Sequence, residues 1–462
     1  MSEPRTFAIR TFGCQMNEHD SERLAGRLRA AGLVSAADES CADVVVLNTC
    51  TIRENADLKL FSALGHLKAR KREHPGLQIV VGGCLAQHER ERIRERAAWV
   101  DVVVGTHNLL ETPALLERSR VEGPLVVVAD APDPVTARDQ VPALTAERDV
   151  PWAAWMTIQT GCDNSCSYCI VPEVRGGEIS RPMEDLVAEA EMLARRGVTE
   201  ITLLGQNVNS YGRDLTGRGT LFGPLLRALG AVAGIERIRF TSPHPKDLGP
   251  DIVAAMAETA AVCPQLHLPL QSGSDRVLTA MRRGYRAARY LERLAMARAA
   301  VADLAVTTDL IVGYPGETDA DFEDTLAVVA EAHYDGAYTF VFSPREGTRA
   351  AGLGDAFIDP GVVRERFDRL KEVVDRSALA RHQARVGRLE EVLVEGPGKR
   401  SGQVSGRTLQ GKLVHLAASA ELSGGTLAEA RIDRAAPYYL TGTVTRVLRP
   451  PRHRRRIALS VS

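Results

Sequence analysis

Residues 161–169 read Gly-Cys-Asp-Asn-Ser-Cys-Ser-Tyr-Cys and bring three thiols, Cys162, Cys166 and Cys169, into one short loop. The loop follows residues 155–160, Trp-Met-Thr-Ile-Gln-Thr, which have the composition of a strand. A structural zinc site usually takes four protein ligands, whereas three cysteines can hold a cubane iron-sulfur cluster and leave one iron open. The spacing therefore favours an iron-sulfur site over a zinc clip or three incidental buried thiols.

Strand-like and helical segments alternate on both sides of this loop, and after it they predict about six β/α units. Such a series forms a partial barrel of parallel strands, which we expect over residues 151–380, with ligands bound at the C-terminal strand ends. After residues 155–160, the expected strands are 200–204, 237–241, 265–270, 305–312 and 337–342, and the expected helices are 183–196, 221–232, 246–257, 286–300 and 319–332.

Polar and glycine-rich groups follow several of these strands and are candidates for binding a cofactor. Glycines let a ligand approach the backbone, and amide side chains can bind its polar groups. Ordinary turns and helix N-caps are the alternative. The candidates are Gly205, Gln206 and Asn207 after the second strand, Gln271 and Ser272 after the fourth, and Ile311, Gly313 and Gly316 at the end of the fifth.

Other polar residues near the barrel were weighed in the same way. Arg175 and Arg181 can grip a carboxylate or phosphate of a cofactor or substrate, or form a salt-bridged surface loop. We expect structural roles for His244 and His267. Glu317 precedes a helix and is expected to favour its N-terminal dipole.

The N-terminal region, residues 1–130, predicts a doubly wound α/β domain with a parallel sheet. Three thiols, Cys14, Cys50 and Cys84, each follow one of its first three strands, at the edge where open parallel sheets bind ligands. Three buried structural thiols fit this pattern equally well, and we assign Cys41 and Cys263 to that class. The expected strands are 7–12, 43–48, 77–81 and 100–104, with helices at 21–31 and 55–72.

The C-terminal region changes pattern. Residues 131–150 are rich in proline and charge and predict a linker, and a helix is expected at 361–385. Short strands at 391–394, 413–416, 429–432 and 440–447 then predict a small antiparallel β-barrel over residues 381–455, with a tail at 456–462. Residues 381–462 hold 15 Lys or Arg and six Asp or Glu. Lys399, Arg400 and Arg407 are therefore candidates for binding nucleic-acid phosphates, whereas Arg454 to Arg456 fit a solvated tail equally well.

Length and composition predict a soluble cytoplasmic protein of two or three domains. A chain of 462 residues is too long for one ordinary core. Its eight cysteines are sparse and clustered, which favours metal or redox chemistry in a reducing compartment over a disulfide framework. The first residues lack a signal-peptide core, and no apolar run reaches the length of a membrane span. We expect a cytoplasmic, soluble monomer with no membrane partner.

The cysteine motifs resemble those of a known family. The Cys-x-x-x-Cys-x-x-Cys loop resembles the signature of radical S-adenosylmethionine (SAM) enzymes. Residues 11–17, 48–54 and 82–87 resemble the N-terminal motifs of the methylthiotransferases, a branch of that superfamily, and the match runs from about residue 5 to the C-terminus. The resemblance implies two 4Fe-4S clusters, one on Cys162, Cys166 and Cys169 with SAM on its open iron, and an auxiliary one on Cys14, Cys50 and Cys84. The C-terminal barrel resembles the RNA-binding TRAM domain.

Within this family, residues 13–17 with 20–22, 204–209, 268–274 and 281–285 are most similar to the branch that acts on tRNA. That likeness implies methylthiolation of carbon 2 of N(6)-isopentenyladenosine at position 37 by a 5′-deoxyadenosyl radical, with sulfur from the auxiliary cluster. It also implies the tRNA anticodon stem-loop as partner, and a flavodoxin or ferredoxin as electron donor. The alternatives are methylthiolation of threonylcarbamoyl-adenosine in tRNA or of a ribosomal-protein aspartate. A redox-sensing RNA-binding protein is a further alternative, but it would not need the glycine-rich strand ends.

Overall fold

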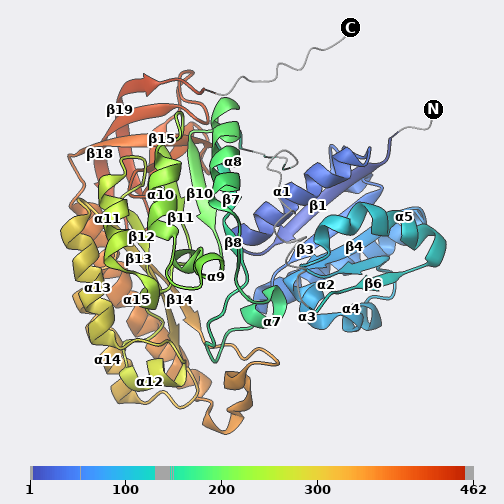
Figure 1. Ribbon diagram of the computed structural model, residues 1–462, viewed down its shortest axis with the longest axis horizontal. Helices are drawn as coiled ribbons and strands as arrows, with labels where there is room; N and C mark the ends of the chain where they lie inside the picture. The colour runs from blue at the N-terminus through green and yellow to red at the C-terminus, as the bar shows by residue number, and fades with distance from the viewer. Residues whose placement is uncertain (1–3, 52–53, 131–145, 147, 149, 453–462) are drawn as a thin grey trace.

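The computed structural model describes residues 4–51, 54–130, 146, 148 and 150–452. Figure 1 shows an N-terminal α/β domain in blue, a central β/α region in green to orange, and a C-terminal barrel in red. Most of the predicted linker and the arginines of the predicted tail beyond Arg452 lie outside the described residues. None of the described helices is both long and apolar enough to cross a membrane.

The N-terminal domain has a six-stranded, fully parallel sheet, which confirms the doubly wound fold. Every residue of its two central strands is buried, because helices cover both faces of the valine-rich sheet. Two short edge strands were not predicted. In sheet order the strands are β2 (Val34–Ser35), β1 (Thr6–Phe12), β3 (Val44–Thr49), β4 (Gln78–Gly83), β5 (Val102–Val104) and β6 (Leu125–Val127), and the helices are α1 (Gln15–Ala30), α2 (Glu54–Glu73), α3 (Cys84–Glu89), α4 (Glu91–Arg96) and α5 (Thr112–Glu122).

The central region forms the predicted partial barrel. Two three-stranded parallel sheets are joined by a bridge between Ile238 and Val262, and a large apolar core lies between the strands and the helices that cover them. The strands are β7 (Ala153–Thr157), β10 (Glu200–Leu204), β11 (Arg237–Phe240), β12 (Gln265–His267), β13 (Ala305–Val312) and β14 (Gly336–Val341), and the main helices are α8 (Met183–Arg195), α10 (Phe222–Gly230), α11 (Pro250–Glu258), α13 (Ala287–Ala300), α14 (Asp319–Ala332) and α15 (Pro360–Gln383).

Two barrel strands are shorter than the sequence predicts. The first ends at Thr157, and residues 159–160 form a separate strand, β8 (Gln159–Thr160), which pairs antiparallel with β9 (Ile179–Ser180). This small ribbon brackets the three-cysteine loop and fixes both of its ends. The fourth strand ends at His267, so residues 268–270 lead into the next loop instead of continuing the strand.

The C-terminal module is a closed five-stranded barrel, and one of its pairings differs from the prediction. β17 and β19 are parallel, because β19 returns beside β17 after pairing with β18. The strand β16 was missed because its sequence, Gln-Val-Ser-Gly-Arg-Thr, is mostly polar. The strands are β15 (Leu389–Pro397), β16 (Gln403–Thr408), β17 (Leu413–Ala417), β18 (Leu427–Ala435) and β19 (Leu440–Arg449).

Buried ionic contacts attach this module to the N-terminal strand ends of the partial barrel. Arg237, the first residue of β11, pairs with Glu391 at 2.8 Å. Lys412 pairs with Asp335, just before β14, at 2.6 Å, and both side chains are buried. The module therefore covers the side of the barrel opposite to the C-terminal strand ends, where the cysteine loop lies.

Candidate active site

The three-cysteine loop connects β8 to the short helix α7 (Val171–Arg175) and is held tightly. Gly161 has φ +78°, and a Cβ there would come within 1.8 Å of the Gly177 carbonyl oxygen, so only glycine fits. The Cys162 amide donates to the Gly176 carbonyl at 3.0 Å. Ser167 donates through its amide to the Met281 carbonyl at 3.1 Å. These contacts fix the positions of the thiols before any cofactor binds.

The thiols of this loop, Cys162, Cys166 and Cys169, form what we call the loop trio. Burial raises the pKa of Cys162, and it raises the pKa of Cys169 to about 12, with the neighbouring thiols adding to both shifts. Two donors face the sulfurs: Asn164 Nδ2 lies 3.3 Å from Cys162 Sγ, and Arg283 Nη1 lies 3.3 Å from Cys166 Sγ. N–H donors beside buried sulfurs suit thiolate ligands of an iron-sulfur cluster.

Cys14, Cys50 and Cys84, which we call the N-terminal trio, lie at the ends of three strands that are neighbours in the sheet. Cys14 is the N-cap of α1, Cys50 directly follows β3, and Cys84 is the first residue of α3. A hydrogen bond with the Cys50 thiol lowers the pKa of Cys14 to about 6. The Cys84 thiol is buried, which raises its pKa. The topology therefore brings together three thiols that are far apart in the sequence.

Three thiols at neighbouring strand ends can hold a cubane cluster and leave one iron open. Among the described residues, no three His, Cys, Asp or Glu side chains are grouped closely enough to hold one metal ion. Gly83, which precedes Cys84, packs closely on the end of β3, because a Cβ there would lie 2.3 Å from Asn48 Oδ1.

The helix that follows the loop trio packs against the helix that begins at Cys84 of the N-terminal trio. Helix α7, which directly follows Cys169, packs against α3, which begins at Cys84, and the two helices lie side by side in Figure 1. Ile170 and Val174 form a small apolar cluster with Cys84. Arg175 Nε donates to Cys84 Sγ at 3.3 Å, and its Nη2 pairs with Asp20 at 2.8 Å. A substrate at this interface would lie between two sulfur-ligand sites.

The residues after β10 offer acceptors for a cofactor ammonium group. Gly205 is buried at the end of the strand. Gln206 Oε1 and Asn207 Oδ1 are buried and have no hydrogen-bond donor within the part of the chain described here. Asn207 Nδ2 donates to Asp247 at 2.9 Å, which aims the free oxygen away from that carboxylate. Buried acceptors without partners are costly unless a ligand supplies donors, and an amino group would do so.

The loop after β12 holds its two candidate residues in different ways. Gln271 has φ +71° and bridges to β13, where its carbonyl accepts from the Ile311 amide at 2.9 Å. Ser272 is fully buried, and its hydroxyl contacts Thr325 Oγ1 at 3.2 Å and accepts from the Ser274 amide. The fold therefore already engages the Ser272 hydroxyl, and the SAM contacts of both residues stay predictions.

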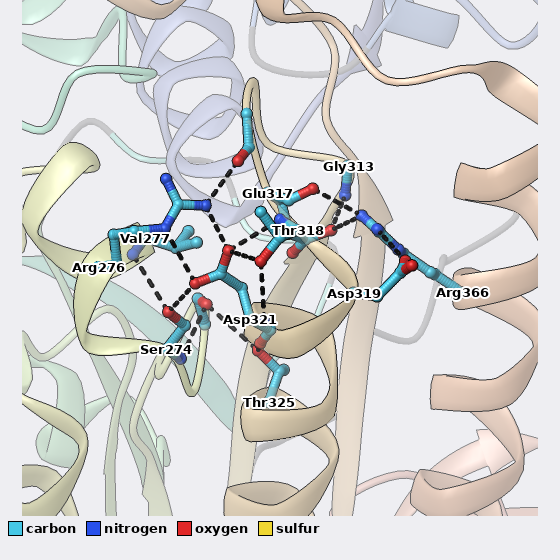
Figure 2. A network of polar contacts seen from close by, with 12 residues as sticks. Ser274, Arg276, Val277, Gly313, Glu317, Thr318, Asp319, Asp321, Thr325 and Arg366 are labelled. Atoms are coloured by element: carbon cyan, nitrogen blue, oxygen red, sulfur yellow. Dashed lines mark hydrogen bonds and ion pairs between the residues drawn. The ribbon is translucent and has the colours of Figure 1, made fainter.

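A polar network fixes the loop after β13 (Figure 2). Glu317 accepts from the Gly313 amide at 3.0 Å and pairs with Arg366 of α15 at 2.9 Å, with both side chains buried. Glu317 also directly precedes the N-cap of α14, so the expected interaction with the helix dipole stays a prediction, beside the ion pair with Arg366 that the sequence did not show. Asp321 accepts from Ser274 and Arg276, and these hydrogen bonds lower its pKa although burial opposes them. The network joins the loops that follow β12 and β13.

Two glycines of this loop have left-handed backbone conformations, and Ile311 lies near the end of β13. Gly313 and Gly316 have φ values of +75° and +77°. A Cβ on Gly313 would lie 2.8 Å from Val363, so the backbone here approaches α15 closely. Ile311 packs beside a cluster that includes Tyr168 of the three-cysteine loop. The ends of β10 and β13 thus face the loop trio from the same rim of the barrel.

Comparison with known sequences separates the chain into three matched regions. The family described as "Uncharacterized protein family UPF0004" matches residues 6–105, the radical SAM superfamily matches residues 156–329, and the TRAM domain matches residues 383–445. A protein of Parafrankia sp. (strain EAN1pec) named tRNA-2-methylthio-N(6)-dimethylallyladenosine synthase is 52% identical over 95% of this chain and 89% of its own. A protein of the same name from Acidothermus cellulolyticus is 51% identical over 95% and 87%.

The chain belongs to the radical SAM methylthiotransferase family. Membership of the radical SAM superfamily implies a 4Fe-4S cluster and SAM. Solved structures share its fold. The radical SAM methyltransferase TsrM from Kitasatospora setae, with cobalamin and a [4Fe-4S] cluster bound, has a TM-score of 0.56 at 13% identity, over 75% of this chain and 77% of its own. The cobalamin-dependent radical enzyme OxsB has a TM-score of 0.50, also at 13% identity, over 79% and 56%.

In this methylthiotransferase, two arginines have roles that differ from the sequence-based suggestion. Arg175 does not face the strand ends that carry the SAM candidates, because it contacts Cys84 and Asp20. Arg181 forms a buried ion pair with Glu189 at 2.8 Å and donates to the Thr157 carbonyl, so it stabilises the barrel. Arg283 was missed as a neighbour of Cys166, since 117 positions separate them and no local pattern joins them.

The two remaining cysteines and the two histidines singled out in the sequence have structural positions, with one correction. Cys263 is buried as expected, but Cys41 is exposed in a short 3₁₀ turn, so its assignment as a buried thiol was wrong. His244 Nδ1 accepts from the Lys246 amide, which is a structural cap. His267 contacts Thr307 through Nδ1 at 2.9 Å and Asp309 through Nε2 at 3.3 Å, so the strands of the barrel engage both ring nitrogens.

The basic candidates of the barrel module differ in availability. Lys399 and Arg400 are exposed on the turn between β15 and β16. Arg407 is exposed too, but its Nε pairs with Glu395 at 2.8 Å and its Nη1 donates to the Gly411 carbonyl. Lys399 and Arg400 on the turn are therefore the more available for binding a phosphate, whereas Arg407 would bind one only in competition with Glu395.

Proposed function

We propose that this chain methylthiolates carbon 2 of N(6)-isopentenyladenosine at position 37 of tRNA. The observation that carries the proposal is the packing of α7 on α3, which sets two separate cysteine trios against one interface. The printed names of the relatives, which are about half identical to this chain along nearly its whole length, support the same reaction.

The residues present suit the groups that this reaction needs. Cys162, Cys166 and Cys169 would hold one 4Fe-4S cluster with SAM, and Cys14, Cys50 and Cys84 would hold a second, the first supplying a 5′-deoxyadenosyl radical and the second sulfur. An aromatic C–H is too weakly acidic for side-chain bases, so the protein contributes position and dryness in place of acid-base chemistry.

Residues at the strand ends would bind and orient SAM. Gln206 and Asn207 would accept hydrogen bonds from its ammonium group through the oxygens that lack protein donors. The backbone at Gly313 and Gly316, held by Glu317 and Arg366, would lie against its nucleoside, and Gln271 would contact it from the neighbouring loop.

The barrel module would bind the tRNA. Lys399 and Arg400, with Arg407 at the edge, would contact phosphates of the anticodon stem-loop, and such binding weakens as salt rises. A flavodoxin or ferredoxin would supply the electron for SAM cleavage. We propose that the protein is a monomer and acts in the cytoplasm. All eight cysteines are free thiols, which suits a reducing compartment.

Nucleoside analysis tests the proposal directly. We expect tRNA from cells that lack the protein to contain isopentenyladenosine without the 2-methylthio group, and the wild-type gene to restore it. Cys166→Ala and Cys50→Ala genes should both fail to restore it. If the 2-methylthio nucleoside persists in the deleted cells, the assignment is wrong. If a threonylcarbamoyl nucleoside or a ribosomal protein loses its methylthio group instead, the alternative substrates apply.

A second assay separates the enzyme from a redox sensor. After anaerobic reconstitution and reduction, the protein should convert SAM to 5′-deoxyadenosine, and Cys166→Ala should abolish this conversion. A sensor that uses its clusters only as switches would give no 5′-deoxyadenosine.

A further inference from the structure

Each cysteine trio has one buried guanidinium that donates to one of its sulfurs. Arg175 Nε lies 3.3 Å from Cys84 Sγ in the N-terminal trio. Arg283 Nη1 lies 3.3 Å from Cys166 Sγ in the loop trio. The two arginines are only 7% and 6% exposed. A buried guanidinium is costly unless negative or polar groups surround it, so its presence beside a sulfur calls for a reason.

The surroundings of the two arginines show what balances their charge. Arg175 pairs with Asp20 at 2.8 Å and with Cys84. Arg283 donates to Cys166, to the Tyr285 hydroxyl at 3.2 Å and to the Pro269 carbonyl at 3.3 Å. Among the described residues, Arg283 has no ion pair with a carboxylate. The sulfur is therefore the natural counter-charge of Arg283, and it shares that role with Asp20 for Arg175.

The position of Arg175 in the chain adds a second point. It is the last residue of α7, the helix that directly follows Cys169 of the loop trio, yet its side chain contacts the N-terminal trio. The same short helix is fixed to the N-terminal domain by Thr106 Oγ1, which donates to the Val174 carbonyl at 2.7 Å. Arg175 thus extends from the loop of one trio to a sulfur of the other.

We infer that Arg175 is a positioning residue that orients Cys84 and raises the reduction potential of the cluster on the N-terminal trio, while Arg283 does the same through Cys166 for the loop trio. A positive N–H donor beside a ligand sulfur stabilises the more negative, reduced state of a cluster, and burial strengthens the interaction. The inference rests on the proposed function, since it takes both trios to hold clusters.

The test uses the full chain with one cluster at a time. In the background Cys162→Ala, Cys166→Ala, Cys169→Ala, only the N-terminal trio can hold a cluster, and its potential is measured by a titration followed by electron paramagnetic resonance. We expect Arg175→Gln to lower the ratio of reduced to oxidised cluster about tenfold at fixed ambient potential, which is about 59 mV for one electron. Arg283→Gln is the matched control and should leave this potential unchanged.

The reciprocal background gives the reciprocal result. With Cys14, Cys50 and Cys84 changed to Ala, Arg283→Gln should lower the potential of the remaining cluster, and Arg175→Gln should not. Equal shifts from both substitutions in either background, or no shift from either, would overturn the inference. That outcome would leave the proposed function intact, because the clusters would still be present.

A conservative variant separates positioning from a merely structural role. Arg175→Lys keeps the charge and should retain the cluster and most of its potential. If Arg175→Gln loses about four irons while its thermal unfolding matches the background and Arg175→Lys retains them, Arg175 orients Cys84 as inferred. If both variants lose the native fold, Arg175 is a structural salt-bridge partner of Asp20 and the inference is wrong. If the N-terminal trio binds no iron even with Arg175 present, the proposed function fails at its second cluster.

Discussion

Removing the Arg366 side chain should destabilise the loop that follows β13, although Arg366 lies outside that loop, on helix α15. Its side chain is 5% exposed and its Nη1 reaches both the backbone oxygen and the carboxylate of Glu317, at 3.1 Å and 2.9 Å. Glu317 in turn accepts from the Gly313 amide. Arg366→Met therefore leaves a buried carboxylate without its cation, next to the backbone that we assign to SAM binding.

The size of the effect follows from the burial of the pair. Removing one partner of a buried ion pair costs about 3–5 kcal/mol, whereas an exposed pair one helical turn apart contributes about 0.3–0.5 kcal/mol. The same helix offers a matched control: Arg364 is 75% exposed and pairs only with Asp368 among the described residues. Arg364→Met removes the same charge without uncovering a buried carboxylate.

Amide hydrogen exchange, measured by mass spectrometry on the full chain, reports the stability of this loop separately from the rest of the protein. A loss of about 3 kcal/mol in the free energy of local opening speeds amide exchange about a hundredfold. We expect that acceleration in the peptide that covers residues 313–321 for Arg366→Met, with a weaker affinity for SAM in the reconstituted protein. Arg364→Met should stay within about twofold of the wild type. Equal protection of this peptide in the two variants would refute the role given to the Glu317–Arg366 pair.

Three further predictions use other parts of the molecule. Gly161→Ala brings a Cβ within 1.8 Å of a backbone oxygen, so an iron assay should find about four irons fewer per chain. Gly219→Ala, which has open space around it, is the control and should keep them. Lys399→Ala with Arg400→Ala should weaken tRNA binding and reduce the slope of log affinity against log salt by about 1–2, whereas an unchanged slope would remove the turn from the RNA surface. Burial lowers the pKa of His244 to about 2, so the stability that it contributes above pH 6.5 is lost as pH falls, by about 2 kcal/mol at pH 5. His244→Asn keeps an acceptor for the cap but cannot be protonated in this range. Denaturant unfolding of this variant should therefore show a smaller loss of stability between about pH 6.5 and pH 5.

The alternation of strands and helices could be predicted from the sequence because several strands are apolar or rich in β-branched residues. The run Val44–Leu47 is wholly apolar, and the β13 segment Ala305–Val312 is rich in β-branched residues, so both favour interior strands of a parallel sheet. The polar strand β16 and the two-residue β2 carry no such signal. Their hydrogen bonds come from partners elsewhere in the fold, so a local pattern cannot show them.

The cysteine sets could be predicted from the sequence, but their surroundings could not. Spacing marks the loop trio, and strand ends mark Cys14, Cys50 and Cys84. The contacts of Arg175 with Cys84 and of Arg283 with Cys166 join residues 91 and 117 positions apart. Neither arginine has a neighbour in sequence that reveals its partner. Only the packing of α7 on α3, and of the loop after α12 (Asp275–Ala280) on the cysteine loop, brings the charges to the sulfurs.

Iron content combined with product analysis tests the central claim most directly. Anaerobically prepared wild-type protein should hold about eight irons per chain, and the variant with Ala at Cys14, Cys50 and Cys84 about four. That variant should still convert SAM to 5′-deoxyadenosine but form no 2-methylthio product. About four irons in the wild type, or a methylthiolated product from the triple variant, would contradict the account.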